Sequence, residues 1–140
     1  MHKNTRSLLA ILIAFAAITS SAEDRSAKNG DISRTQARTV VLTFLKYQGF
    51  KTESPQLDLE DDHDSKAYPG FYMFHAYYDT ATRLDSIGTY AVDRRTSALW
   101  DRMTCKQLES GVLKPLQHML TKLTGASESK IENANTKPCL

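Results

Sequence analysis

The sequence predicts an α+β fold in which a small antiparallel sheet of three to four strands packs against an N-terminal and a C-terminal helix. Two stretches, 33–49 and 112–125, space their apolar residues at helical intervals. Between them, residues 71–78 are rich in the aromatic side chains that strands favour. The strand-like segments follow one another instead of alternating with helices, which favours an α+β arrangement over a parallel sheet.

The N-terminal helix has signals at both of its ends. Ser33 and Gln36 form an S-x-x-Q capping box, in which each side chain can bond a backbone N–H that the first turn leaves free. Gly49 is a natural C-terminal stop. Five apolar residues repeat at the spacing of one helix face, and the predicted buried face is Ala37, Val40, Val41, Phe44 and Leu45.

Four segments have strand character, namely 57–60, 71–78, 86–92 and 98–101. Leu57 and Leu59 alternate with acidic residues, as in a short edge strand. The aromatic strand carries large apolar groups on both faces, so we expect one face to meet a helix and the other a cleft or a partner. Gly88 indicates a bulge or a close approach of another group.

A second helix is expected near the C-terminus. Thr104 and Gln107 repeat the capping-box spacing, which predicts a single helical turn before it. The helix itself should begin near Val112, because Pro115 is tolerated only in a first turn, and should end at Gly125. Its apolar stripe is narrow and consists of Leu113, Leu116, Leu120 and Leu123.

The first 22 residues have the pattern of a secretory signal. A basic start at His2, Lys3 and Arg6 is followed by an apolar run of 11 residues and by small residues that place a cleavage site after Ala22. The run is shorter than the roughly 20 helical residues that span a bilayer core. No cysteine follows it to carry a bacterial lipid anchor. We therefore expect a periplasmic or secreted protein with no membrane anchor.

Cleavage leaves 118 of the 140 residues, which suits one hydrophobic core. Residues 23–30 are charged, small and polar, and we expect them to be disordered. A single α+β domain should span 31–125, and a polar tail should span 126–140. Without Lys3 and Arg6 the 18 basic residues fall to 16, which equals the 16 acidic residues. A net charge of zero gives no argument for binding nucleic acid or an anionic membrane.

Both cysteines, Cys105 and Cys139, remain after cleavage. An even number of cysteines in an exported chain predicts a disulfide, here one that tethers the polar tail to the domain. In the chain-entropy view, closing a loop of about 35 residues contributes roughly 3–4 kcal/mol to stability.

The chain has no nucleophile, metalloprotease or phosphate-loop motif, so we expect no catalytic residue and no cofactor, although distant residues could still assemble an active site. The acidic run that starts at Asp58 fails the calcium-loop pattern, because its sixth position is His63 and its twelfth is Pro69. We expect no metal site. The run is either a solvated loop or a set of carboxylates presented to a basic partner.

Tyrosine is enriched at protein interfaces, and the aromatic strand carries more aromatic surface than two helices can cover. We therefore predict a binding face that joins the acidic run to nearby tyrosines, the last two only if the strand exposes them. The predicted residues are Asp61, Asp62, Asp64, Tyr68, Tyr72 and Tyr78.

The stretch from Ile87 to Trp100 resembles the end of a PepSY-type unit, in which a strand finishes in a V-D-x-x-T-G turn and re-enters as a short strand. The matching turn spans Val92 to Thr96, and Ser97 replaces the usual glycine, so this turn must hold a non-glycine residue in a left-handed conformation or adopt another geometry. The resemblance implies a noncatalytic module that inhibits or binds an extracytoplasmic hydrolase, and it supplies no catalytic residues.

Three functional hypotheses follow from these observations. The leading one is an exported binding protein that inhibits, or confers immunity against, a cell-wall-degrading enzyme through a protein–protein contact. The alternative is a small-molecule-binding or hydrolytic domain of cystatin-like or NTF2-like architecture that uses His75, Tyr77 and Asp93. The third is a structural component of the envelope, and the oligomeric state is left open.

Overall fold

The computed structural model describes residues 30–62, 66–125 and 137–139. Its element order confirms the predicted α+β class, with five strands where we expected three or four. The elements are α1 (Arg34–Tyr47), β1 (Leu57–Asp61), β2 (Phe71–Asp79), β3 (Leu84–Asp93), β4 (Leu99–Asp101), β5 (Lys106–Leu108) and α2 (Leu113–Thr124).

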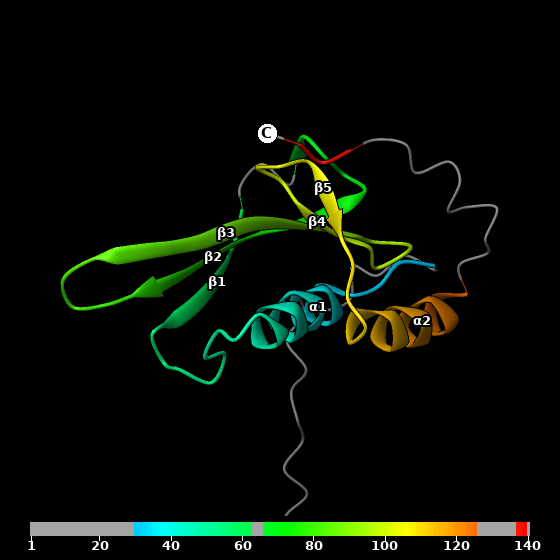
Figure 1. Cartoon of the computed structure of the whole chain (residues 1–140). Coiled ribbons are helices and arrows are strands. Elements are labelled where there is room, and N and C mark those ends of the chain that lie inside the picture. The colour runs from blue at the N-terminus through cyan, green and yellow to red at the C-terminus, as the bar shows by residue number, and fades with distance from the viewer. Residues whose placement is uncertain (1–29, 63–65, 126–136, 140) are drawn as a thin grey trace, which may run out of the picture.

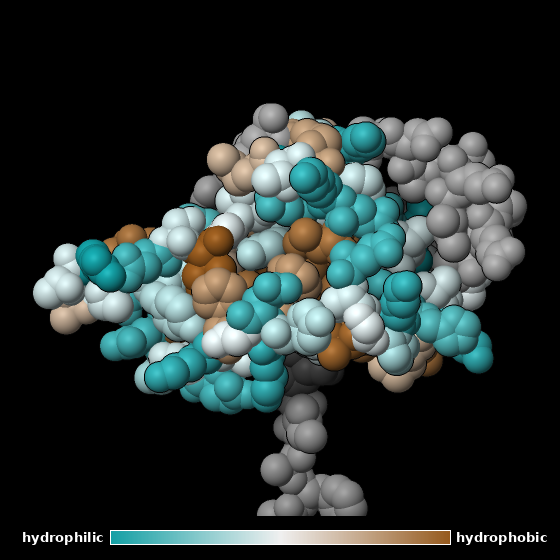
Figure 2. All heavy atoms as spheres, in the orientation of Figure 1, coloured by the Kyte–Doolittle hydropathy of each residue, from teal (hydrophilic) through white to brown (hydrophobic). Residues whose placement is uncertain are grey.

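The five strands form one antiparallel sheet in the order β1-β2-β3-β4-β5, so each strand pairs with its neighbour in sequence. Both helices lie on the same face of this sheet, and the β2–β3 hairpin projects beyond the end of α1 (Figure 1). In the same view, hydrophobic residues gather in the middle of the molecule where the sheet meets the helices, and hydrophilic residues surround them (Figure 2).

The N-terminal helix begins and packs as its sequence predicts. The Ser33 N–H donates to Gln36 Oε1 at 2.7 Å, and the Gln36 N–H donates to Ser33 Oγ at 3.2 Å, which completes the capping box. All five residues of the predicted apolar face are buried. They form the main core together with the helix-facing side of the sheet, which contributes Leu59, Tyr72, Phe74, Ala76, Tyr90, Val92 and Leu99.

Two turns with nearly the same sequence shape the C-terminal half of the sheet. Asp-Arg-Arg-Thr-Ser joins β3 to β4, and Asp-Arg-Met-Thr-Cys joins β4 to β5. In the first, Asp93 Oδ1 accepts the N–H groups two and three residues ahead, at 2.8 and 2.9 Å. In the second, Asp101 Oδ1 does the same at 2.8 and 3.2 Å. Ser97 and Cys105 close the turns with left-handed φ angles of 56° and 54°.

These turns explain where the expected secondary structure was wrong. The single helical turn predicted around Thr104 and Gln107 is instead the second hairpin turn followed by β5. Asp101 accepts the same N–H groups as a helix N-cap would, but the left-handed φ of Cys105 ends the turn and β5 pairs back against β4. The first turn shows that the left-handed position expected to need glycine is filled by Ser97, which is fully buried.

Gly88 lies beside an irregularity in strand pairing and under a buried ring. Ala76 pairs with Gly88 whereas Tyr77 pairs with Ser86, so β3 carries one extra residue here. A Cβ atom at Gly88 would lie 2.9 Å from Tyr90 Oη and 3.1 Å from Tyr90 Cζ. Tyr90 is itself held edge-on against Phe44, with ring centroids 6.2 Å apart. Both of the predicted explanations for this glycine therefore apply.

Replacing Gly88 with alanine should lower the free energy of unfolding by about 1–3 kcal/mol, because the buried Tyr90 ring has little room to move away. Urea unfolding followed by circular dichroism measures this change. In a Tyr90→Phe background the contact to the hydroxyl oxygen is gone, so the cost of alanine should be smaller. An equal cost in both backgrounds would contradict the steric explanation.

Candidate functional site

The face of the sheet that lies away from the helices is divided into a covered half and an open half. The covered half contains a small second cluster made of Phe71, Met73 and Ala91, with Tyr68 and Trp100 packed against it. The Tyr68 hydroxyl donates to the Cys139 carbonyl at 2.7 Å, so the segment before β2 and the end of the C-terminal tail hold each other over this half. In Figure 1 the C-terminal end lies beyond β4 and β5, opposite the helices.

A buried charge lies at the centre of the covered half. Arg102, in the β4–β5 turn, is only 1% exposed, and its guanidinium donates to the Asp62 carboxylate. It also lies over the ring of Tyr68, with Cζ 5.9 Å from the ring centroid. Burying a charge is tolerated only when it is paired and hydrogen-bonded. Asp62 supplies a carboxylate for this charge, and the Tyr68 ring lies against it.

The predicted disulfide is confirmed. Cys105 and Cys139 are bonded across 34 residues of sequence, with Cα atoms 5.1 Å apart. Since Cys105 closes the same turn that contains Arg102, the disulfide fastens the tail directly above the buried charge. Residues 126–136 lie outside the described part of the chain, so only the fastened end of the tail, 137–139, is described.

The structure gives several of the predicted binding residues internal roles. Asp61 pairs with Arg34 at 2.5 Å, and both side chains are a little under half exposed. Asp62 pairs with buried Arg102. Asp64 lies outside the described residues. The acidic run is therefore not simply a solvated loop, because two of its carboxylates neutralise arginines of the domain.

The predicted tyrosines differ in exposure. Tyr72 is only 5% exposed, so its inclusion in a surface is corrected: its hydroxyl donates to the Ile32 carbonyl at 3.1 Å and Arg94 Cζ lies 4.4 Å from its ring centroid. Tyr78 is half-buried, and its hydroxyl accepts the Lys51 N–H at 2.8 Å, which ties the segment after α1 to β2. Tyr68 is also half-buried and belongs to the covered half described above.

The open half carries a different set of polar and aromatic residues, which we call the open face and define as Asp58, Glu60, His75, Tyr77 and Ser86. Tyr77 Oη donates to Asp58 Oδ2 at 3.1 Å and lies 3.4 Å from Glu60 Oε2. His75 Nε2 lies 2.9 Å from Ser86 Oγ, and the rings of His75 and Tyr77 are 5.2 Å apart. These contacts cross three strands and hold the side chains as one polar layer.

The open face is negatively charged. Strand alternation places Asp58 and Glu60 on it, and no lysine or arginine occupies a position of β1, β2 or β3 that points to this side. Within the described residues neither of these two carboxylates forms an ion pair, whereas the next two acids in sequence do. Partial burial, the hydrogen bond to Asp58 and the charges of Asp58 and Glu60 all raise the pKa of the Tyr77 phenol.

The outer edge of β1 is closed to a further strand. Asp58 Oδ1 accepts the Leu59 N–H at 2.7 Å, and the Arg38 guanidinium donates to the Leu59 carbonyl. The neighbouring outward N–H, that of Leu57, donates to the Ser54 carbonyl at 3.1 Å. Three outward backbone groups of this edge are already bonded, which disfavours pairing with a partner strand there.

The alternative site made of His75, Tyr77 and Asp93 is not assembled. His75 and Tyr77 are neighbours, but Asp93 is buried at the far end of β3, where its carboxylate holds the turn. Asp93 pairs with Phe71, which lies four residues before His75 on β2, and this corresponds to about 13 Å.

In the described part of the chain, no group of three or more His, Cys, Asp or Glu residues could hold a metal ion. No helix described there is long and apolar enough to cross a membrane.

The alternation that predicts the edge strand also indicates which residues line the open face. In the segment Leu57–Asp61 the leucines alternate with Asp58 and Glu60, so burying Leu59 places both acids on the opposite side. Strand alternation likewise puts His75 and Tyr77 on one face of β2. What the sequence could not provide is the register that sets Asp58 opposite Tyr77.

Replacing Asp62 with asparagine should cost about 3–5 kcal/mol, because it leaves the buried Arg102 charge without its carboxylate. Asp61→Asn is the matched control: its ion pair with Arg34 is solvated, so its loss should cost less than about 1 kcal/mol. Urea unfolding at neutral pH measures both changes. Equal costs would show that the Arg102–Asp62 pair does not support the covered half as described.

The Tyr77 phenol should titrate above its ordinary pKa of about 10. Tyrosine ring carbons resolved by NMR give this value directly. The double variant Asp58→Asn/Glu60→Gln should lower the Tyr77 pKa only in part, since partial burial remains. Because the folded protein holds this proton more tightly than the unfolded chain, the free energy of unfolding should fall as pH rises above about 10. An unchanged Tyr77 pKa in the double variant would contradict its coupling to the two acids.

No protein-family model matches the sequence, and no curated protein matches it. Among solved structures, the chain is similar to a chain in the structure of a type VI secretion system effector-immunity complex from Pseudomonas protegens. The TM-score is 0.61 with 26% sequence identity, and the similarity covers 78% of this chain and 90% of that chain. The similarity therefore covers most of both chains, and the similar chain is a component of an effector-immunity complex.

Proposed function

We propose that this chain is an immunity protein, a noncatalytic module that binds a bacterial toxin and blocks its activity. The observation that carries the proposal is the structural similarity to a chain of the effector–immunity complex, which extends over 90% of that chain. The absence of a recognised nucleophile, phosphate-binding or metalloprotease motif favours the immunity side of such a pair over the effector side.

The proposed site of action is outside the cytoplasm. The disulfide between Cys105 and Cys139 supports this, since disulfides persist in oxidising compartments. The signal-like first 22 residues, which lie outside the described structure, point the same way. A toxin blocked there would act on the envelope, and we propose a cell-wall-degrading enzyme as the target. The PepSY-type resemblance around Val92–Thr96 supports the same class of partner.

The fold suits inhibition by stoichiometric binding. Among the described residues, the helices pack on one face of the sheet and the disulfide fastens the end of the tail, so this part of the chain should lose little conformational entropy on binding. The alternative hydrolytic role gains no support from the geometry, because Asp93 lies apart from His75 and Tyr77.

Co-expression with the secreted cell-wall-degrading effectors of the same bacterium, each directed to the periplasm, tests this proposal. The full chain should restore growth against one of them, and a chain lacking residues 2–22 should not. The mature protein, purified from the periplasm, should form a 1:1 complex with that effector in size-exclusion chromatography with light scattering. If the exported chain is itself toxic, or if protection needs no leader, the proposal is wrong.

A further inference from the structure

We infer that the open face is the docking surface of this protein and that its occupant is a cationic surface of the toxin, one that presents lysine or arginine side chains. This inference rests on the proposed function and deepens it, because it names the chemistry that recognises the partner. The face was defined above by Asp58, Glu60, His75, Tyr77 and Ser86.

The location of the open face follows from what covers the rest of the sheet. Both helices cover one face, and the Tyr68 segment with the C-terminal tail covers half of the other. The remaining half has no covering element among the described residues, and its acids and Ser86 are exposed. It stands on the projecting β2–β3 hairpin and on β1, so it can reach a concave partner without displacing any part of the domain.

Charge selects the occupant. Asp61 and Asp62 are neutralised by Arg34 and Arg102, but the open face contains two further carboxylates and no lysine or arginine. Desolvating these carboxylates against an apolar or acidic partner would be unfavourable, whereas a guanidinium or ammonium group would replace the lost hydration. On a chain that is expected to have no net charge once its leader is removed, this local field also steers the approach of a basic partner.

The face also has the aromatic component that interfaces require. The adjacent rings of His75 and Tyr77, tilted by 48° to each other, provide aromatic faces on which a guanidinium can stack. The hydrogen bond from Tyr77 to Asp58 fixes the direction of that carboxylate before binding, which reduces the entropy lost on association. The bonds at Leu59 disfavour strand addition at β1, which favours side-chain contacts of this kind.

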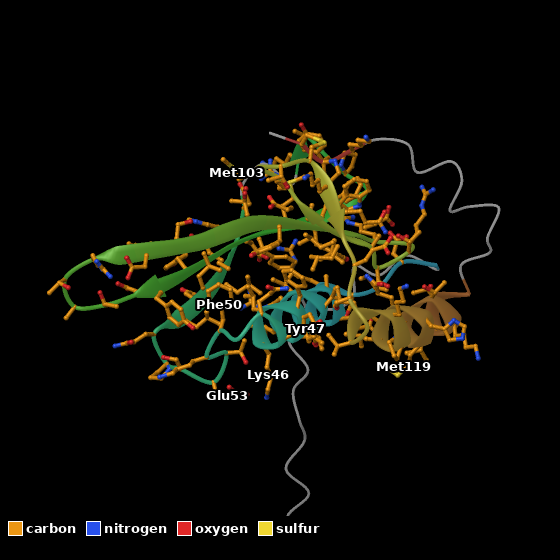
Figure 3. All side chains as sticks on the ribbon, in the orientation of Figure 1. Lys46, Tyr47, Phe50, Glu53, Met103 and Met119 are labelled. Carbon is orange, nitrogen blue, oxygen red and sulfur yellow. A yellow bond between two sulfur atoms is a disulfide. The ribbon has the colours of Figure 1, made fainter. Side chains whose placement is uncertain are left out.

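Charge reversal with a matched control tests the inference. The double variant Asp58→Lys/Glu60→Lys changes the open face. The variant Glu53→Lys/Glu109→Lys makes the same net change elsewhere, since Glu109 is exposed directly after β5, at the opposite edge of the sheet from β1. Glu53 lies beside Lys46 below the end of α1, on the helix side of the molecule (Figure 3). Melting temperature and circular dichroism establish that each variant is folded, and Asp58→Asn/Glu60→Gln is the milder pair if the lysine variant fails to fold.

Two probes separate this inference from the proposed function. The first is a synthetic octapeptide of alternating arginine and glycine, titrated into the ¹⁵N-labelled mature protein. It should shift the amide signals of Asp58, Glu60 and Tyr77, and the shifts should vanish at high salt because the contact is electrostatic. The second is the effector captured in the growth experiment, whose Kd should rise about tenfold or more in the open-face variants and less than about threefold in the control.

Each result has a definite meaning. Peptide shifts confined to other surfaces, or equal effector affinity in the open-face and control variants, would overturn the docking surface. Peptide binding at the open face with no protective effector found would overturn the proposed function and leave the cation-binding face standing. Effector binding that is lost in the open-face variants and weakened by salt would support both.

Discussion

A guanidinium with almost no access to solvent controls how one side of this molecule is built. Arg102 is buried beside the carboxylate of Asp62, a residue that directly follows β1. Tyr68 in turn needs the carbonyl of Cys139, which the disulfide holds in reach. The loop, the tail and the covalent bond together enclose one charge.

The segment around Tyr68 and the end of the tail cover only one part of the outer face of the sheet. The segment around Tyr68 packs where β2 begins, β3 ends and Trp100 lies on β4. Toward the β2–β3 hairpin and β1, the outward positions carry polar groups that solvate well. A sheet with helices on one face thus has a covered half and an open half on the other.

Local features were predictable from the sequence, and pairings across the fold were not. The α1 capping box and its five buried residues are properties of neighbouring positions, and they were predicted residue by residue. The strand β5 was missed because Asp101 starts a turn whose sequence also fits a helix cap. Asp62 and Tyr68 were predicted to lie in a binding surface. Their actual partner, Arg102, lies 40 residues beyond Asp62, so no local pattern in the sequence indicates that it contacts them. The open face needed the register of β1 against β2, which no local pattern contains.

The closed edge of β1 has a consequence for the behaviour of many copies of the chain together. An unpaired strand edge is a template on which identical molecules can stack into a continuous sheet. The Arg38 guanidinium and the Asp58 carboxylate occupy the outward hydrogen-bonding positions of Leu59, which disfavours stacking of identical molecules at the β1 edge. Asp58 therefore serves twice, because one of its oxygens bonds this edge and the other meets Tyr77.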